Sequence, residues 1–152
     1  MIYLLDTDTT ILMMRGLSIA APKNEKQRQR QETGKRIIGA CRLHSAKGDV
    51  IGLSAITVAE LEFGAGCADR PDLKRVHMRR VLAPFTKFDF GADEPARHYG
   101  EVRSALTAKG QCIGPNDFLI AAHALALSAT LVTNNTKEFK RAKGLKCENW
   151  SV

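Results

Sequence analysis

The sequence lacks the features that mark secreted, membrane-spanning and zinc-binding proteins. Its four cysteines are scattered without a C-x-x-C pair, so a zinc site with paired ligand spacing is not expected. No apolar run approaches the roughly 20 residues that cross a bilayer. The N-terminus has no basic leader and reaches Asp6 too early for a signal peptide, so a cytoplasmic location is expected. Aromatic residues make up only 6%, but the hydrophobic fraction of 44% excludes a mainly disordered chain.

The length and the charge of the chain narrow the possibilities further. A chain of 152 residues predicts one domain over residues 1–152, with a core large enough to need no disulfide or metal staple. Lysine and arginine number 23 against 16 acidic residues, which gives a net charge of +7. This excess attracts polyanions, nucleic acid first. A basic protein without such a partner has the same composition, so charge alone does not decide.

Short apolar runs alternate with helical patterns along the chain. The expected strands are 2–5, 50–55, 86–90, 130–133 and, at an edge, 146–150. The clearest expected helices are 71–82, 94–109 and 117–128. Leu73, Val76 and Leu82 are spaced to face the core from the first of these helices. Alternation of strands and helices predicts an α/β sandwich around a mostly parallel sheet.

Residues 22–36 depart from the rest in composition, because they are almost wholly polar and carry six cations. The stretch forms either a protruding basic helix or a loop. RNA contact is one use for it, and a solvated surface insertion is the other interpretation. The insertion is the preferred interpretation on composition alone.

Three acidic residues follow expected strands or open expected helices. Asp6 ends the first strand, Glu60 is expected in the first turn of the helix after the second strand, and Asp117 opens the helix at 117–128. In a parallel sheet the carboxyl ends of the strands lie along one edge, where open α/β sheets bind ligands. The three carboxylates are therefore expected to meet in one crevice.

Clustered carboxylates repel one another and need a cation. Oxygen ligands without histidine or cysteine at ligand spacing favour Mg²⁺, with Mn²⁺ as the alternative. Such an ion lowers the pKa of a bound water and offsets charge at a phosphodiester under attack. This set predicts hydrolysis of a nucleic acid.

Each acid also has a purely structural interpretation. Asp6 is placed to cap the following helix, and Asp117 to interact with a helix dipole. Thr57-x-x-Glu60 fits a capping box, which by itself accounts for Glu60. Taken singly, the structural interpretation of each acid is the stronger one. The functional interpretation depends on all three lying at one sheet edge in a basic protein.

Four segments, in order, resemble the PIN-domain ribonucleases of the VapC toxin family. They are Tyr3-Leu4-Leu5-Asp6-Thr7-Asp8, Thr57-Val58-Ala59-Glu60-Leu61-Glu62-Phe63-Gly64, Gly114-Pro115-Asn116-Asp117-Phe118-Leu119-Ile120-Ala121-Ala122-His123-Ala124 and Leu131-Val132-Thr133-Asn134-Asn135-Thr136-Lys137-Glu138-Phe139. Each is weak alone, whereas four in this order are a strong signal. The resemblance implies a PIN-like α/β/α sandwich over nearly the whole chain.

The resemblance also implies an activity and partners. It implies a Mg²⁺-dependent endoribonuclease that cuts tRNA or rRNA, a VapB-like antitoxin that covers the active groove, and a homodimer. It implies that Asp6, Glu60 and Asp117 hold the metal, with the Thr133 hydroxyl orienting the metal shell. Many PIN nucleases carry an acid where Asn135 stands, and this departure argues against a second tightly bound metal.

Two rival functions remain open on the sequence. Asp6-Thr7-Asp8-Thr9-Thr10 resembles the D-x-D-x-T motif of HAD-type phosphatases, in which Asp6 would be the nucleophile and a covalent aspartyl-phosphate would form. The second rival is a non-catalytic nucleic-acid-binding module, whose action would survive Asp6→Asn.

Overall fold

A computed structural model describes all of residues 1–152. Five strands form its sheet: β1 (Ile2–Leu5), β2 (Val50–Ser54), β3 (Thr86–Phe88), β4 (Thr130–Val132) and β5 (Lys146–Glu148). The helices are α1 (Thr7–Gly16), α2 (Glu25–Ala46), α3 (Ala55–Gly66), α4 (Pro71–Leu82), α5 (Glu94–Ala108), α6 (Pro115–Ala126) and α7 (Thr136–Phe139). All five expected strands are present, although β2 and β4 end one residue earlier than expected, and β3 and β5 two residues earlier.

The sheet is parallel throughout, which confirms the predicted α/β class. Its strand order is β3-β2-β1-β4-β5, and every neighbouring pair runs in the same direction. From β1 the chain moves outward to β2 and β3, then crosses back to place β4 on the other side of β1. The winding therefore reverses between β1 and β4, and a ligand site is expected beyond the carboxyl ends of these two strands.

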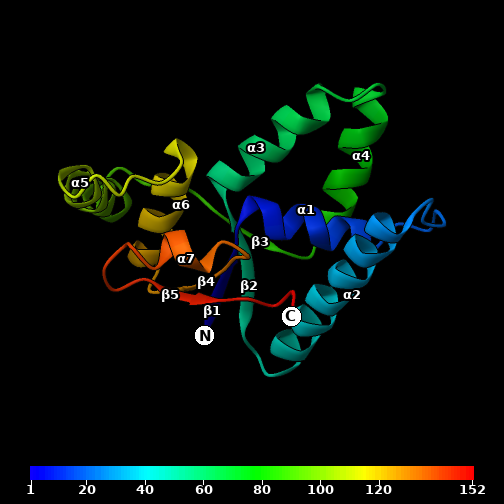
Figure 1. The fold of residues 1–152 in the computed structure, drawn as a ribbon, viewed down its shortest axis with the longest axis horizontal. Coiled ribbons are helices and arrows are strands. Elements are labelled where there is room, and N and C mark those ends of the chain that lie inside the picture. The colour runs from blue at the N-terminus through cyan, green and yellow to red at the C-terminus, as the bar shows by residue number, and fades with distance from the viewer.

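Helices cover both faces of the sheet, because successive strand residues point to opposite faces. Tyr3 and Leu5 belong to a core shared with α1 to α4, whereas Leu4 belongs to a second core shared with α5, α6 and α7. Figure 1 shows the sheet between these two groups of helices. The predicted α/β/α sandwich is confirmed. None of the helices combines the length and the hydropathy that a membrane-spanning segment requires.

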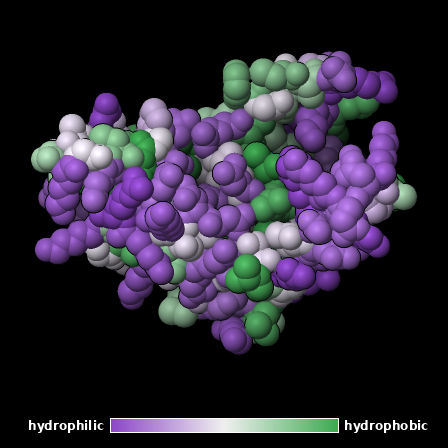
Figure 2. All heavy atoms as spheres, viewed as in Figure 1, coloured by the Kyte–Doolittle hydropathy of each residue, from purple (hydrophilic) through white to green (hydrophobic).

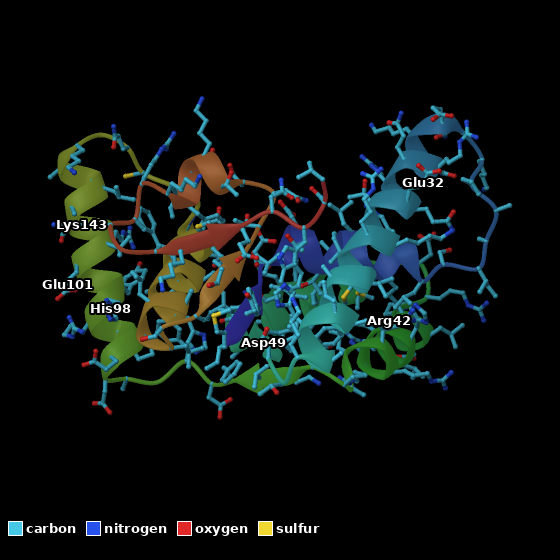
Figure 3. All side chains as sticks on the ribbon, turned by 90° about the horizontal axis from the view of Figure 1, so that it is seen from below. Glu32, Arg42, Asp49, His98, Glu101 and Lys143 are labelled. Atoms are coloured by element: carbon cyan, nitrogen blue, oxygen red, sulfur yellow. The ribbon has the colours of Figure 1, made fainter.

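Helix α2 contains most of the polar stretch 22–36 and packs closely on α1. Its first residues are exposed on every side, and burial begins at Gly34 and Ile37. Figure 3 shows α2 running past the sheet, with Glu32 near one end and Arg42 toward the other. A Cβ added at Gly34 would collide with the backbone at Leu12 and Gly16. The backbones of α1 and α2 can therefore approach each other this closely only because both contact points, Gly16 and Gly34, are glycines.

The expected core contacts of α4 are partly wrong. Leu82 is buried, but Leu73 and Val76 are 54% and 56% exposed. Helices α3 and α4 form an arm that projects from the sheet, as Figure 1 shows at the top of the molecule. Because the arm has an outer side that no other element covers, only part of its apolar pattern reaches the core.

Gly34→Ala is expected to destabilise the fold by about 3 kcal/mol, the upper end for overpacking, since backbone atoms line the site and cannot rotate away. Gly39→Ala on the same helix is the matched control, because nothing lies within 4 Å of a Cβ there. That control is expected to be neutral or stabilising by up to about 1 kcal/mol. Urea denaturation checks both, and equal midpoints for the two variants would contradict the close α1–α2 contact.

Candidate active site

Asp6 lies where β1 ends and α1 begins, and its side chain is nearly buried at 5% exposure. It caps α1, since its Oδ1 accepts a hydrogen bond from the Thr9 backbone N–H at 2.7 Å. Burial raises the pKa of the Asp6 carboxyl, while hydrogen bonds from Thr133 and Thr9 act in the opposite direction. The capping role is therefore confirmed. Asp6 Oδ1 caps α1, and the carboxylate also contacts Thr133, which follows the neighbouring strand β4.

Glu60 lies in the second turn of α3 rather than the first. Ser54 is the residue that caps α3, through its hydroxyl and the Ile56 N–H at 3.1 Å, so the capping-box interpretation of Glu60 is wrong. The Thr7 hydroxyl donates to Glu60 Oε2, and Asn116 Nδ2 donates to Oε1 at 2.8 Å. These donors come from the β1–α1 junction and from α6. Glu60 thus links the segments that carry the other two acids.

Asp117 lies in the first turn of α6, after Gly114 and Pro115. Its pKa is raised to about 6, first by burial and then by the negative charges of Asp6, Glu60, Asp8 and Glu138. No side-chain hydrogen bond or ion pair to Asp117 offsets this repulsion. The structure therefore brings the three predicted acids into one electrostatic neighbourhood at the carboxyl edge of the sheet.

Thr133 and Asn135 follow β4 at the same edge. Thr133 is fully buried, and its hydroxyl accepts a hydrogen bond from the Asn135 backbone N–H at 3.0 Å. Asn135 begins α7 without using its side chain as a cap. Thr133 therefore connects the Asp6 carboxylate to the β4–α7 turn, and the Asn135 amide group is left available.

The donor set fits a hard divalent cation. As the side chains stand, no three histidine, cysteine or acidic residues are grouped as a metal cluster, and Glu60 is directed to Thr7 and Asn116. The acids nevertheless repel one another at Asp117, and all are oxygen donors, which Mg²⁺ and Mn²⁺ prefer. Two buried oxygens in the segments that follow β1 and β4, Thr9 Oγ1 and Asn134 Oδ1, have no hydrogen-bond partner. Buried acceptors of this kind are commonly satisfied by ordered water.

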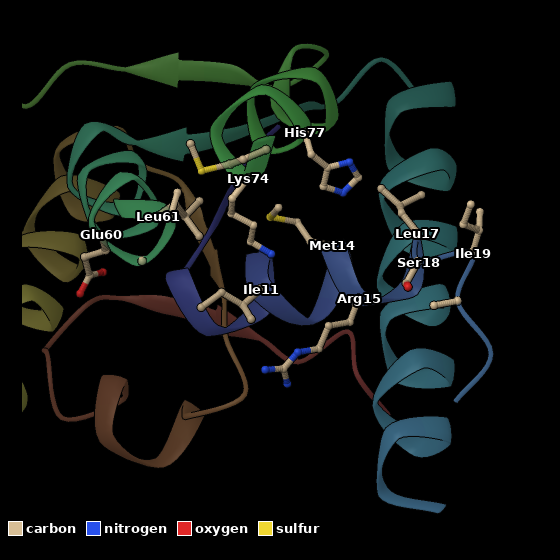
Figure 4. Close-up of a pocket in the computed structure, with 14 residues that line it drawn as sticks. Ile11, Met14, Arg15, Leu17, Ser18, Ile19, Glu60, Leu61, Lys74 and His77 are labelled. Atoms are coloured by element: carbon tan, nitrogen blue, oxygen red, sulfur yellow. The ribbon is translucent and has the colours of Figure 1, made fainter. Parts of the chain in front are cut away.

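A cavity of about 690 Å³ opens beside Glu60, between α1, α3 and α4. Figure 4 shows its apolar lining, which includes Ile11, Met14 and Leu61, with Lys74 and Arg15 as its cations. In Figure 2 hydrophobic atoms lie at the bottom of a hollow between the α3–α4 arm and α2. The edge of the sheet where Asp6, Glu60 and Asp117 lie is called the acidic edge. It continues into a groove that has apolar side chains inside and cations at its border.

Comparisons with known proteins agree with this geometry. A family model described as the PIN domain matches residues 22–145. The chain belongs to the PIN-domain family. Among its relatives, "Ribonuclease VapC2" of Rickettsia felis is 44% identical over 105 residues, which is 69% of this chain and 78% of the relative. The "tRNA(fMet)-specific endonuclease VapC" of Shigella flexneri is 35% identical over 99 residues, 65% of this chain and 74% of that protein.

A solved structure extends the likeness to the full length. A chain in the structure of VapBC2 from Rickettsia felis, bound to a DNA fragment from its promoter, matches with a TM-score of 0.82 and 35% identity. The match covers 99% of this chain and 99% of the matched chain. The four segments predicted that this chain is a VapC ribonuclease of the PIN-domain family. That prediction is confirmed.

Sequence reasoning missed the groups that hold the acids of this PIN domain in place. Thr7 and Asn116 each stand next to a predicted acid, at Asp6 and Asp117, but their shared target Glu60 is more than 50 positions from either. The charges of Asp8 and Glu138 also contribute to the raised pKa of Asp117. His123 is a packed core histidine, and its Nδ1 lies 2.8 Å from Ser54 Oγ.

Gly114→Ala is expected to lower nuclease activity by about a hundredfold while the fold persists. A Cβ at Gly114 would lie 2.7 Å from Asp117 Oδ2, so the carboxylate must move, and misplacement by about 1 Å costs roughly that factor. The measurement is RNA cleavage rate together with the melting temperature. Gly100→Ala on α5 is the control, since its Cβ would meet nothing within 4 Å. Unchanged cleavage by a folded Gly114→Ala protein would show that the position of Asp117 does not matter.

Proposed function

We propose that this protein is a divalent-metal-dependent endoribonuclease, the toxin of a toxin–antitoxin module, with tRNA as its foremost candidate substrate. One observation carries the proposal: Asp6, Glu60 and Asp117 share one edge of the sheet, and their charges act together on Asp117. The net charge of +7 suits a polyanionic substrate. Relatives named as VapC ribonucleases and as a tRNA endonuclease support the substrate class. The cytoplasm, where tRNA is found, is its proposed location.

Asp6, Glu60 and Asp117 hold the metal, Mg²⁺ or in its place Mn²⁺, in this proposal. When bound, such an ion supplies a water of lowered pKa and offsets negative charge at the phosphorus. The protein's part is to fix the ligands. The Thr9 N–H orients Asp6 from one side, and Thr7 and Asn116 orient Glu60. Thr133 and Asn135 complete the set: Thr133 holds Asp6 beside β4, and the Asn135 amide is placed to bind a water or a phosphate oxygen.

The two rival functions receive less support. A phosphatase that uses Asp6 as its nucleophile is not favoured, because the relatives reported above are named as ribonucleases and as a tRNA endonuclease. A non-catalytic binding module has no use for neighbouring acids whose charges raise the pKa of Asp117, since these acids oppose nucleic acid binding. Neither rival accounts for Thr7 and Asn116 converging on Glu60.

The groove beside Glu60 suits the antitoxin. Apolar side chains, Ile11, Met14 and Leu61 among them, line the cavity between α1, α3 and α4. Exposed apolar surface of this kind marks protein contact sites. We propose that a VapB-like antitoxin lays an apolar segment in this groove, next to the acids. A homodimer, which the family resemblance implies, remains part of the proposal.

Asp6→Asn and Asp117→Asn are each expected to lower RNA cleavage by at least about a hundredfold. Groups that merely orient metal ligands account for about 10–100-fold, and a ligand itself accounts for more. The measurement is cleavage of purified tRNA by the protein with Mg²⁺, and chelator is expected to abolish the wild-type activity. Growth arrest on expression without antitoxin is expected to disappear in both variants.

Asp69→Asn is the control for this pair, because Asp69 is exposed and lies outside the acidic edge. It is expected to cleave like the wild type. Full cleavage by folded Asp6→Asn and Asp117→Asn proteins, or cleavage that survives chelator, would refute the proposed function.

A further inference from the structure

A second pocket, distinct from the groove at Glu60, lies where α1 leads into α2. It has a volume of about 410 Å³. Three cations line it, Arg15 at the end of α1, Lys23 before α2, and Arg30 within α2, and no acidic residue does. None of the three forms an ion pair in the structure. We call this site the α1–α2 basic pocket.

The absence of acids distinguishes this pocket from the ion-paired arginines of α4 and α5. On α4, Arg75 and Arg79 are paired with Glu62, and on α5, Arg97 is paired with Glu94 and Glu101. Three cations gathered without a counter-charge raise the local positive potential and attract an anion. The α1–α2 basic pocket is thus suited to a phosphate group.

Hydrogen bonds hold the segment that forms the wall of the pocket against α2. Gln31 Nε2 donates to the Ser18 carbonyl at 2.8 Å and to the Ala20 carbonyl at 3.4 Å. Gln27 Oε1 accepts from the Lys23 backbone N–H at 2.7 Å. Two side chains of α2 therefore tie down the connecting segment. The Gly16–Gly34 contact fixes α1 against the same helix, so the backbone segments that carry the three cations are held together.

Arg15 connects the basic pocket to the groove that contains Glu60, because it lines both. Asp6 caps the start of α1 and Arg15 lies nine positions later, which is about 14 Å along a helix axis. At 3.4 Å per nucleotide this length corresponds to roughly four nucleotides of stacked strand. A strand cut at the acidic edge and running along α1 thus reaches Arg15.

We propose that the α1–α2 basic pocket binds a backbone phosphate of the RNA substrate, roughly four nucleotides from the cut. This inference rests on the proposed function. An acidic protein segment is the less favoured occupant, since the lining is mostly polar and the apolar surface that protein contacts require lies in the neighbouring groove. The pocket gives the polar stretch 22–36 a role beyond solvation.

The test compares two double variants that remove the same charge from α2 and its flanks. Lys23→Gln with Arg30→Gln alters the pocket. Arg42→Gln with Lys47→Gln is the matched control, because both residues are exposed and Arg42 lies 12 residues, or about 18 Å, along α2 from Arg30. For each protein, KM and kcat for tRNA cleavage are measured with Mg²⁺ over a range of salt concentrations.

The pocket variant is expected to raise KM roughly tenfold with kcat unchanged, and to lower the salt slope by about one for each cation removed. The control variant is expected to have a KM and a salt slope close to those of the wild type. Once the cut is mapped, the RNA can be shortened so that only two nucleotides remain beyond the cut on the side that runs along α1. Such an RNA does not reach the pocket, so the two double variants are expected to cleave it with the same KM.

Each contrary result has its own meaning. If wild-type protein cleaves RNA and the two double variants behave alike, the inference is wrong and the proposed function stands. If the pocket variant loses affinity for the antitoxin while its KM for RNA is unchanged, the inference is also wrong and the pocket belongs to the protein partner. If wild-type protein shows no metal-dependent cleavage, the proposed function fails and the inference with it.

Discussion

The repulsion between carboxylates at one edge of the sheet is the constraint on which this structure depends. Asp117 shows it most clearly, because burial and four nearby acids raise its pKa to about 6. In the proposed function a bound cation offsets these charges, which would otherwise be costly to hold together in a partly buried site. The surrounding polar groups make sense as supports: Thr7 and Asn116 for Glu60, and Thr133 for Asp6.

The fold and the location of the site were largely predictable from local patterns. Apolar runs that end in Asp6 and precede Glu60 indicate parallel strands whose carboxyl ends meet, and the topology then follows from alternation with helices. The supports of Glu60 were not predictable, because they depend on contacts between residues more than 50 positions apart. The capping-box pattern at Thr57 failed because Ser54, three residues earlier, already caps the helix.

One wrong expectation and one feature that the sequence did not predict have a common physical reason. The exposure of Leu73 and Val76 could not be read from helical spacing, since spacing identifies an apolar stripe but not what covers it. In the same way, the polar stretch 22–36 gave no sign that Gly34 lets α2 approach the backbone of α1. Both the α3–α4 arm and the α1–α2 pair are thus defined by tertiary contacts. The arm and α1 border the groove at Glu60, and each contributes apolar side chains and one cation, Lys74 from the arm and Arg15 from α1.

The most direct measurement of the central claim is calorimetric titration of the purified protein with Mn²⁺, for the wild type and for Glu60→Gln. The account predicts one saturable site in the wild type, a melting temperature that rises with added metal, and loss of both effects in Glu60→Gln while the fold remains intact. No saturable binding by the wild type, or equal binding by the variant, would contradict the claim that these acids are gathered to hold a metal.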